Sequence, residues 1–268
     1  MISPLIFERV ILQARKKPAK TVIFSPDREP LTYAALARQI EYTVDTMNAW
    51  GIGRNDRVVL AMADRPSFAT ALLGLCSCTS VMPYDPSASI AEYEKIIKEF
   101  EIGTLITDRA YDSPAIAAQS LGKRLIHLKP GMISGEFELT GGQITNCENP
   151  GYAHLDDIAL IISTSGSTGP AKAVPLSHRQ LNLRNQHVSD SAELNEEDRY
   201  LCIMPLFHAH GLILGVTTPV AVGMSVIFPG DFEKETFLRC LNSFKPSFYS
   251  GSFTHQQTIL NWVIKQPN

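Results

Sequence analysis

Residues 158–177 read IALIISTSGSTGPAKAVPLS, a continuous apolar run followed at once by hydroxyls, two glycines and a lysine. A run such as 158–163, apolar and bounded by polar residues, is typical of a central parallel strand that is buried on both faces. After the loop, Ser177 with Gln180 three residues later predicts the capping-box start of a helix. The stretch therefore indicates a buried strand of an α/β protein with a polar loop directly behind it.

Outward from this stretch, helix-like and strand-like segments alternate, which is the pattern of doubly wound, mainly parallel sheets with flanking helices. We expect helices over residues 5–14, 33–50, 67–77, 90–100, 211–220, 233–242 and 253–264, and strands over 21–25, 57–62, 103–107, 124–128, 199–203, 225–228 and 247–249. Between Lys129 and Asn149 the pattern fades among glycines, which favours a linker or surface excursion. We therefore predict two packed α/β subdomains, residues 1–150 and 151–268, the second of which carries the loop.

Composition excludes several classes of protein. The net charge of -3 and the lack of a long basic run argue against nucleic-acid binding. Five scattered cysteines without metal-ligand spacing predict reduced, mostly buried thiols. The longest apolar stretch, Gly211–Gly223, is interrupted by threonines and a proline and is shorter than the ~20 residues of a membrane span. With no secretion signal at the N-terminus, we expect a cytoplasmic protein without a transmembrane segment.

The loop Thr164–Lys172 has the residue types that a polyphosphate requires. Glycines let backbone N–H groups converge as an anion nest, hydroxyls donate to phosphate oxygens, and the lysine adds a positive charge. The loop differs from G-x-x-x-x-G-K-[ST], because Ala171 and Ala173 flank the lysine. A Ser/Gly turn that joins a strand to a helix is the alternative. The candidate phosphate-binding residues are Thr164, Ser165, Gly166, Ser167, Thr168, Gly169 and Lys172.

The same loop resembles the signature loop of the adenylate-forming (ANL) superfamily, which includes acyl-CoA synthetases, luciferases and the adenylation domains of peptide synthetases. Three further stretches are similar to motifs of that superfamily and occur in the same order. They are residues 31–36 (LTYAAL), 81–86 (VMPYDP) and 204–212 (MPLFHAHGL). An ordered set is far more specific than any single motif, and the resemblance extends over essentially the whole chain.

Residues 249–256 (YSGSFTHQ) extend the resemblance toward CoA ligases of the oxalyl-CoA synthetase type. The resemblance implies that His208, His210, Gly251 and His255 lie near the nucleotide and the acyl pocket. Two other interpretations of these histidines are considered beside the resemblance. His208 and His210 invite a metal site, but no third ligand is evident, so we predict none. His255 is also readable as an ordinary polar residue near the start of a helix.

The resemblance implies an ATP-dependent ligase. A carboxylate attacks the α-phosphate of ATP to form an acyl-adenylate and pyrophosphate, and the thiol of coenzyme A then displaces AMP. The loop, with Lys172 as the catalytic residue, would hold the phosphates by positioning and charge. Mg²⁺ is expected to accompany the nucleotide.

In the superfamily, the magnesium-binding Glu, the ribose-binding Asp, the hinge and a C-terminal catalytic Lys lie beyond the last motif found here. We therefore expect this chain to be the N-terminal part of a longer acyl-CoA ligase that does not complete turnover alone. The expected partners are a small-molecule carboxylate, ATP and coenzyme A, and a homodimer stays open. The alternative is a non-catalytic nucleotide- or acyl-binding module, or one chain of a split enzyme.

Overall fold

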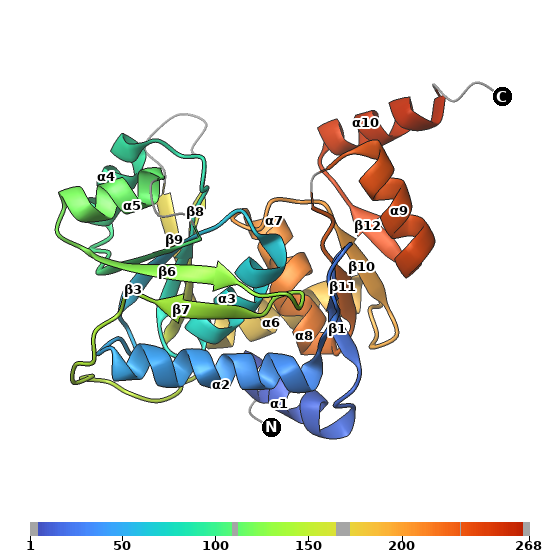
Figure 1. Ribbon diagram of the computed structural model, residues 1–268. Helices are drawn as coiled ribbons and strands as arrows, with labels where there is room; N and C mark the ends of the chain where they lie inside the picture. Colours follow the sequence, from blue (N-terminus) through green and yellow to red (C-terminus); the bar gives the residue numbers. More distant parts are fainter. Residues whose placement is uncertain (1–4, 109–111, 165–171, 231, 265–268) are drawn as a thin grey trace.

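Two mainly parallel sheets form the frame of the molecule (Figure 1). The computed structural model describes residues 5–108, 112–164, 172–230 and 232–264. One sheet has seven strands in the order β7-β6-β5-β3-β4-β8-β9, and the other has five in the order β12-β10-β11-β1-β2. Among the described strands, only the pairs β6–β7, β8–β9 and β1–β2 are antiparallel. These pairs lie at sheet edges, so each sheet has a parallel interior.

The strands are β1 (Thr21–Phe24), β2 (Leu31–Thr32), β3 (Arg57–Ala61), β4 (Ser80–Pro83), β5 (Thr104–Thr107), β6 (Arg124–Pro130), β7 (Phe137–Thr140), β8 (Ile158–Thr164), β9 (Lys172–Ser177), β10 (Arg199–Cys202), β11 (Ser225–Ile227) and β12 (Phe248–Ser250). The helices are α1 (Ile6–Lys16), α2 (Tyr33–Ala49), α3 (Arg65–Cys76), α4 (Ile90–Glu99), α5 (Ser113–Ser120), α6 (His178–Ser191), α7 (Ala209–Leu212), α8 (Thr218–Val222), α9 (Lys234–Phe244) and α10 (Phe253–Ile264), with a π-helical turn (Ile213–Thr217) between α7 and α8.

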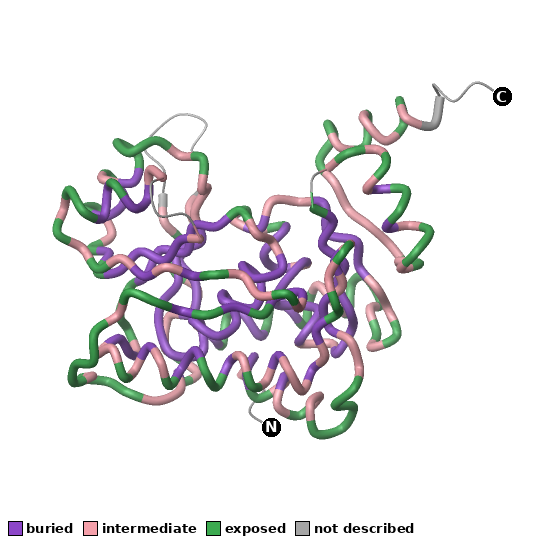
Figure 2. The backbone as a smooth tube through the Cα atoms, viewed as in Figure 1, coloured by how far each residue is buried: buried purple, intermediate pink, exposed green. Residues whose placement is uncertain are grey.

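The two sheets face each other across a shared core, which appears as the buried centre of Figure 2. Side chains of β3 and β11 belong to this one cluster, together with those of α1, α2 and α3. Helix α3 is buried along almost its whole length and is apolar on all sides, as expected of a helix inside a core. Helices α4 and α5 cover the outer face of the larger sheet, and α9 covers that of the smaller one. The predicted α/β fold with flanking helices is confirmed.

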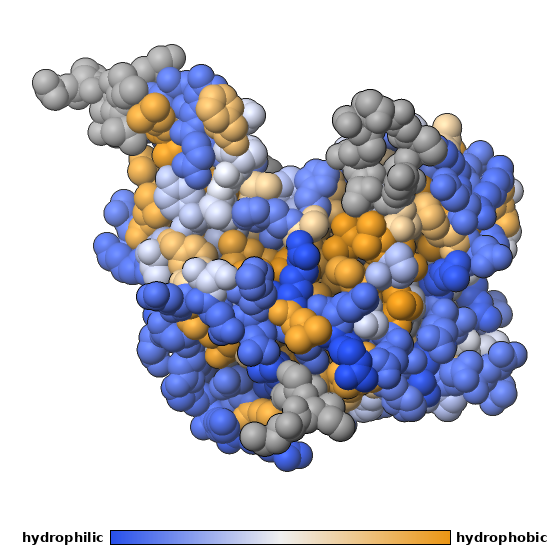
Figure 3. Space-filling view, turned by 180° about the vertical axis from the view of Figure 1, so that it is seen from behind, coloured by the Kyte–Doolittle hydropathy of each residue, from blue (hydrophilic) through white to orange (hydrophobic). Residues whose placement is uncertain are grey.

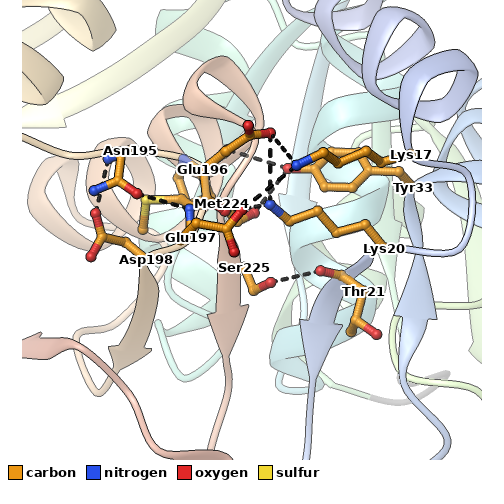
Figure 4. A network of polar contacts seen from close by, with 11 residues as sticks. Lys17, Lys20, Thr21, Tyr33, Asn195, Glu196, Glu197, Asp198, Met224 and Ser225 are labelled. Atoms are coloured by element: carbon orange, nitrogen blue, oxygen red, sulfur yellow. Dashed lines mark hydrogen bonds and ion pairs between the residues drawn. The ribbon is translucent and has the colours of Figure 1, made fainter.

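A polar network ties the N-terminal segment to the second half of the chain (Figure 4). Lys17 Nζ lies 3.0 Å from Glu196 Oε2, and Lys20 donates to the Glu196 carbonyl. The buried Tyr33 hydroxyl donates to the Met224 carbonyl at 2.9 Å. These contacts accompany the parallel pairing of β1 with β11. Each sheet therefore takes strands from both sides of residue 150, and the division of the chain there stays a prediction.

The apolar run 158–163 forms β8, and the predicted capping box of Ser177 and Gln180 begins α6. β8 is parallel to β4 but antiparallel to β9, so the expectation of a central parallel strand holds on one side only. Strand β9 was not expected, because Pro175 interrupts it. Proline lacks an N–H and is tolerated only where no sheet partner needs that donor, as in this edge strand.

The helix expected over residues 211–220 is divided by the π-helical turn. Pro219 has no N–H to continue the helical ladder, which explains the local widening. The hydroxyls of Thr217 and Thr218 donate to Asn185 Oδ1 at 2.8 and 3.2 Å and so fix the widened turn to α6. The anchored residues are the end of the π-helical turn and the start of α8; among the candidate histidines, His210 lies within α7 and His208 is the N-cap residue that precedes it.

In the part of the chain that the structure describes, no helix is long and apolar enough to cross a membrane. The cytoplasmic location and the homodimer stay predictions.

Candidate functional site

The carboxyl ends of β10 and β12 lie side by side, because the two strands are parallel and pair Cys202 with Ser250. The segments that follow them contain His208, His210, Gly251 and His255. Figure 3 shows that this end of the molecule is hollowed between the lobe of α9 and α10 and the lobe of β8 and β9. In Figure 1, α7 lies between these two lobes.

Arg65 holds the segment that leaves β10. Its Nη2 donates to the carbonyls of Cys202 at 2.8 Å and Met204 at 2.6 Å, and its guanidinium lies 5.8 Å from the centre of the Phe228 ring. Arg65 is the first residue of α3, so this contact joins the central helix to the small sheet. Hydrogen bonds from a charged donor are stronger than neutral ones, and this pair fixes the path of the backbone into the site.

Gly211 is required by a close approach within this segment. A Cβ at Gly211 would lie 2.2 Å from the carbonyl oxygen of Pro205, a distance no side chain could adopt. The N–H of His208 faces the same carbonyl at 3.4 Å, and the His208 carbonyl accepts from Leu212 at 2.9 Å. The backbone therefore turns tightly into α7, where His208 and His210 are both exposed. The ring of His208 packs on Phe207 with centroids 4.5 Å apart.

His210 is joined to the small sheet by a chain of hydrogen bonds. Its Nε2 lies 2.8 Å from Ser250 Oγ, which in turn lies 2.6 Å from the hydroxyl of Tyr200. Tyr200 is fully buried, and burial raises the pKa of its hydroxyl well above its usual range. Ser250 ends β12 and Tyr200 lies within β10, so the parallel register of the two strands assembles this contact.

Gly251 and His255 also meet. A Cβ at Gly251 would lie 2.8 Å from the Cβ of His255 and 3.1 Å from Ile203 Cδ1. Ser252 Oγ lies 2.6 Å from His255 Nδ1, and Phe232 packs edge-on against the imidazole at 4.7 Å. Burial, with a smaller contribution from the positive charge of Arg65, lowers the pKa of His255. A neutral, oriented imidazole therefore lies at the start of α10.

The predicted phosphate loop connects two neighbouring strands. Thr164 ends β8 and pairs with Lys172, the first residue of β9. The other candidate phosphate-binding residues, Ser165, Gly166, Ser167, Thr168 and Gly169, lie outside the described residues. In Figure 1, β8 and β9 lie on the opposite side of α7 from β12. The backbone thus brings Thr164 and Lys172 to the same end of the molecule as the histidines.

No cluster of three or more His, Cys, Asp or Glu side chains suited to a metal ion occurs among the described residues. Tyr200, Ser250 and Arg65 are site residues that sequence reasoning did not single out. Ser250 lies inside the quoted stretch 249–256, which is the one signal that pointed to it. Arg65 and Tyr200 carried no signal, because their roles depend on contacts with residues more than 40 positions away.

A sequence model of the family described as "AMP-binding enzyme" matches residues 11–267. The chain belongs to this family. It is 26% identical to "Probable CoA ligase CCL9" of Humulus lupulus over 88% of the chain and 47% of that protein. It is 25% identical to an oxalate–CoA ligase of Arabidopsis thaliana over 95% of the chain and 51% of that protein.

The fold agrees with that of solved structures. Apo MatB from Rhodopseudomonas palustris superposes with a TM-score of 0.80 at 22% identity, over 96% of this chain and 50% of that one. Similarity at this identity establishes the shared architecture. This AMP-binding enzyme chain spans about half the length of the curated relatives it matches and corresponds to their N-terminal portion.

Proposed function

We propose that this chain forms the ATP-phosphate and acyl-binding part of an AMP-forming acid–thiol ligase, which converts a carboxylic acid to an acyl-adenylate and then to an acyl-CoA thioester. The observation that carries the proposal is the family match over residues 11–267, which includes the complete loop Thr164–Lys172. The proposal extends to ATP, coenzyme A and a small carboxylate as substrates. The chain belongs to the AMP-binding enzyme family, and the proposal does not specify which carboxylic acid is the substrate.

The loop is proposed to hold the β- and γ-phosphates of ATP. Its glycines, hydroxyls and Lys172 supply N–H, O–H and ammonium donors, which would stabilise the charge that develops on the departing pyrophosphate. The role of this chain is therefore positioning and electrostatics, and none of its side chains needs to act as a nucleophile. Mg²⁺ is proposed to arrive with the nucleotide. Because no described cluster suits a metal ion, we assign no magnesium ligand to this part of the chain.

His208, His210, Gly251 and His255 are proposed to line the nucleotide-proximal end of the acyl pocket. The support is their position at the carboxyl ends of two adjacent parallel strands, which is where ligands bind in open α/β sheets. Gly251 leaves room for His255, and a larger residue there would displace the imidazole.

ATP binding to the chain itself tests the loop assignment. Isothermal titration should give a measurable affinity for ATP that falls at least tenfold in Lys172→Ala, since a charge-assisted contact to phosphate is lost. The matched control is Lys123→Ala, because Lys123 lies outside the loop and the site segments. Equal ATP affinity in Lys172→Ala and the parent chain would reject the loop as the phosphate site.

Turnover needs a separate test. The polypeptide as it occurs in source cells should be sized by immunoblot and then assayed for ATP–pyrophosphate exchange with short mono- and dicarboxylates. Exchange that depends on a carboxylate would support the ligase. A native product near 29.5 kDa that binds ATP without exchange would favour the binding-module or split-enzyme alternative instead.

A further inference from the structure

We propose that Tyr200 and Ser250 are positioning residues for His210. They hold the Nε2 atom of His210 as a hydrogen-bond acceptor. The ring then offers its Nδ1–H as a donor to an anionic ligand. The inference rests on the proposed function for the meaning of that ligand. The hydrogen-bond chain itself depends only on the fold. The inference gives the exposed His210 a defined tautomer.

The hydrogen bonds from Tyr200 through Ser250 to His210 have regular geometry. Ser250 Oγ lies between two partners, 2.6 Å from the Tyr200 hydroxyl and 2.8 Å from His210 Nε2. Both distances are those of well-formed hydrogen bonds. Tyr200 cannot move freely, because it is fully buried and its ring stacks on Phe248 with centroids 5.0 Å apart. Tyr200 is therefore the rigid, buried end of this series of hydrogen bonds, and His210 is its exposed end.

The protons of these hydrogen bonds have a defined direction. Burial keeps Tyr200 protonated, because it raises the pKa of the phenol, and a phenol has a single proton to donate. Two acceptors lie near that hydroxyl, Ser250 Oγ and the thiol of Cys202. A thiol is a weak acceptor, so the proton goes to Ser250. In the neutral form of the His210 ring, the Ser250 proton is then directed to Nε2, and the imidazole proton sits on Nδ1.

His208, two residues before His210, serves as an internal control for the tautomer of His210. Its ring packs on Phe207 and has no hydrogen-bond partner among the described residues. Nothing described fixes its tautomer, so it should show the mixture usual for a solvated imidazole, in which Nε2–H dominates. Both histidines are exposed, and His210 is the one whose ring nitrogen contacts the Ser250 hydroxyl.

The test is the tautomeric state of both histidines in the ligand-free chain, read from ¹⁵N chemical shifts and long-range ¹H–¹⁵N correlations at pH 8. His210 should be mainly Nδ1–H and His208 mainly Nε2–H. Ser250→Ala should return His210 to the pattern of His208, and Ser250→Thr, which keeps the hydroxyl, should restore Nδ1–H. Tyr200→Phe should weaken the preference, because Ser250 is then free to donate elsewhere.

Two results would overturn the inference. One is an Nε2–H tautomer of His210 in the parent chain, and the other is an unchanged His210 tautomer in a folded Ser250→Ala variant. Circular dichroism and the His208 signals report whether each variant is folded. The tautomer is read without a ligand, whereas the proposed function is tested by ATP affinity in Lys172→Ala. Either proposal can therefore fail without the other.

Discussion

The buried histidine at the start of α6 makes the stability of this protein depend on pH. His178 is 1% exposed, and neither ring nitrogen makes a well-formed hydrogen bond among the described residues. Burial lowers the pKa of His178 from 6.5 to about 4, and the Cys76 backbone and the charge of Asp157 oppose this only in part. The folded protein therefore holds an imidazole that resists protonation.

The sign and size of the effect follow from linkage. As the pH falls, the unfolded chain takes up the proton first, because the pKa of its histidine is higher than that of the folded state. The stability that depends on neutral His178 is complete above pH 6.5, falls as the pH drops toward 4, and levels off below it. The shift corresponds to about 3 kcal/mol in full and to about 2 kcal/mol at pH 5.

Urea denaturation at pH 7 and pH 5 measures this loss. We compare the parent chain with His178→Leu, which removes the titrating group without breaking a well-formed hydrogen bond, and with His187→Leu on the exposed side of the same helix. Between the two pH values, the parent and His187→Leu should each lose about 2 kcal/mol more than His178→Leu. Equal losses in all three proteins would show that His178 is not held neutral by burial.

Two further changes test the site. Gly251→Ala should destabilise the protein by about 1–3 kcal/mol and shift the NMR signals of His255, since the new Cβ overlaps that side chain. The control is Gly103→Ala, where a Cβ meets open space. This variant should leave the urea stability and the His255 signals unchanged. Arg65→Met should cost about 2–4 kcal/mol, because two carbonyls lose a charged donor. It should also raise the pKa of His255 in an NMR titration, because a positive charge that lowers it is removed. A pKa of His255 that stays constant would contradict this account.

Periodic segments were predicted well from sequence because their burial repeats along the chain. Helix α10 (Phe253–Ile264) begins and ends where the pattern placed it, and the Ser177 capping box marks the start of α6. The edge elements were missed. β7 is four residues long within a glycine-rich stretch, and β9 contains a proline, so neither has a local signal strong enough to identify it. Both form because a neighbouring strand supplies hydrogen-bond partners.

The family and the α/β class could be predicted from sequence alone, since they depend on residue types in a fixed order, whereas the phosphate-loop residues stay a prediction. The pairing of β1 with β11, and the contact of His210 with Ser250 across 40 residues, could not be predicted. Such contacts depend on strand order and register, which bring together residues whose separation along the chain carries no pattern. The tertiary structure therefore decided which polar side chains share the site, and through Tyr200 and Ser250 it also assigns His210 the tautomer that we propose.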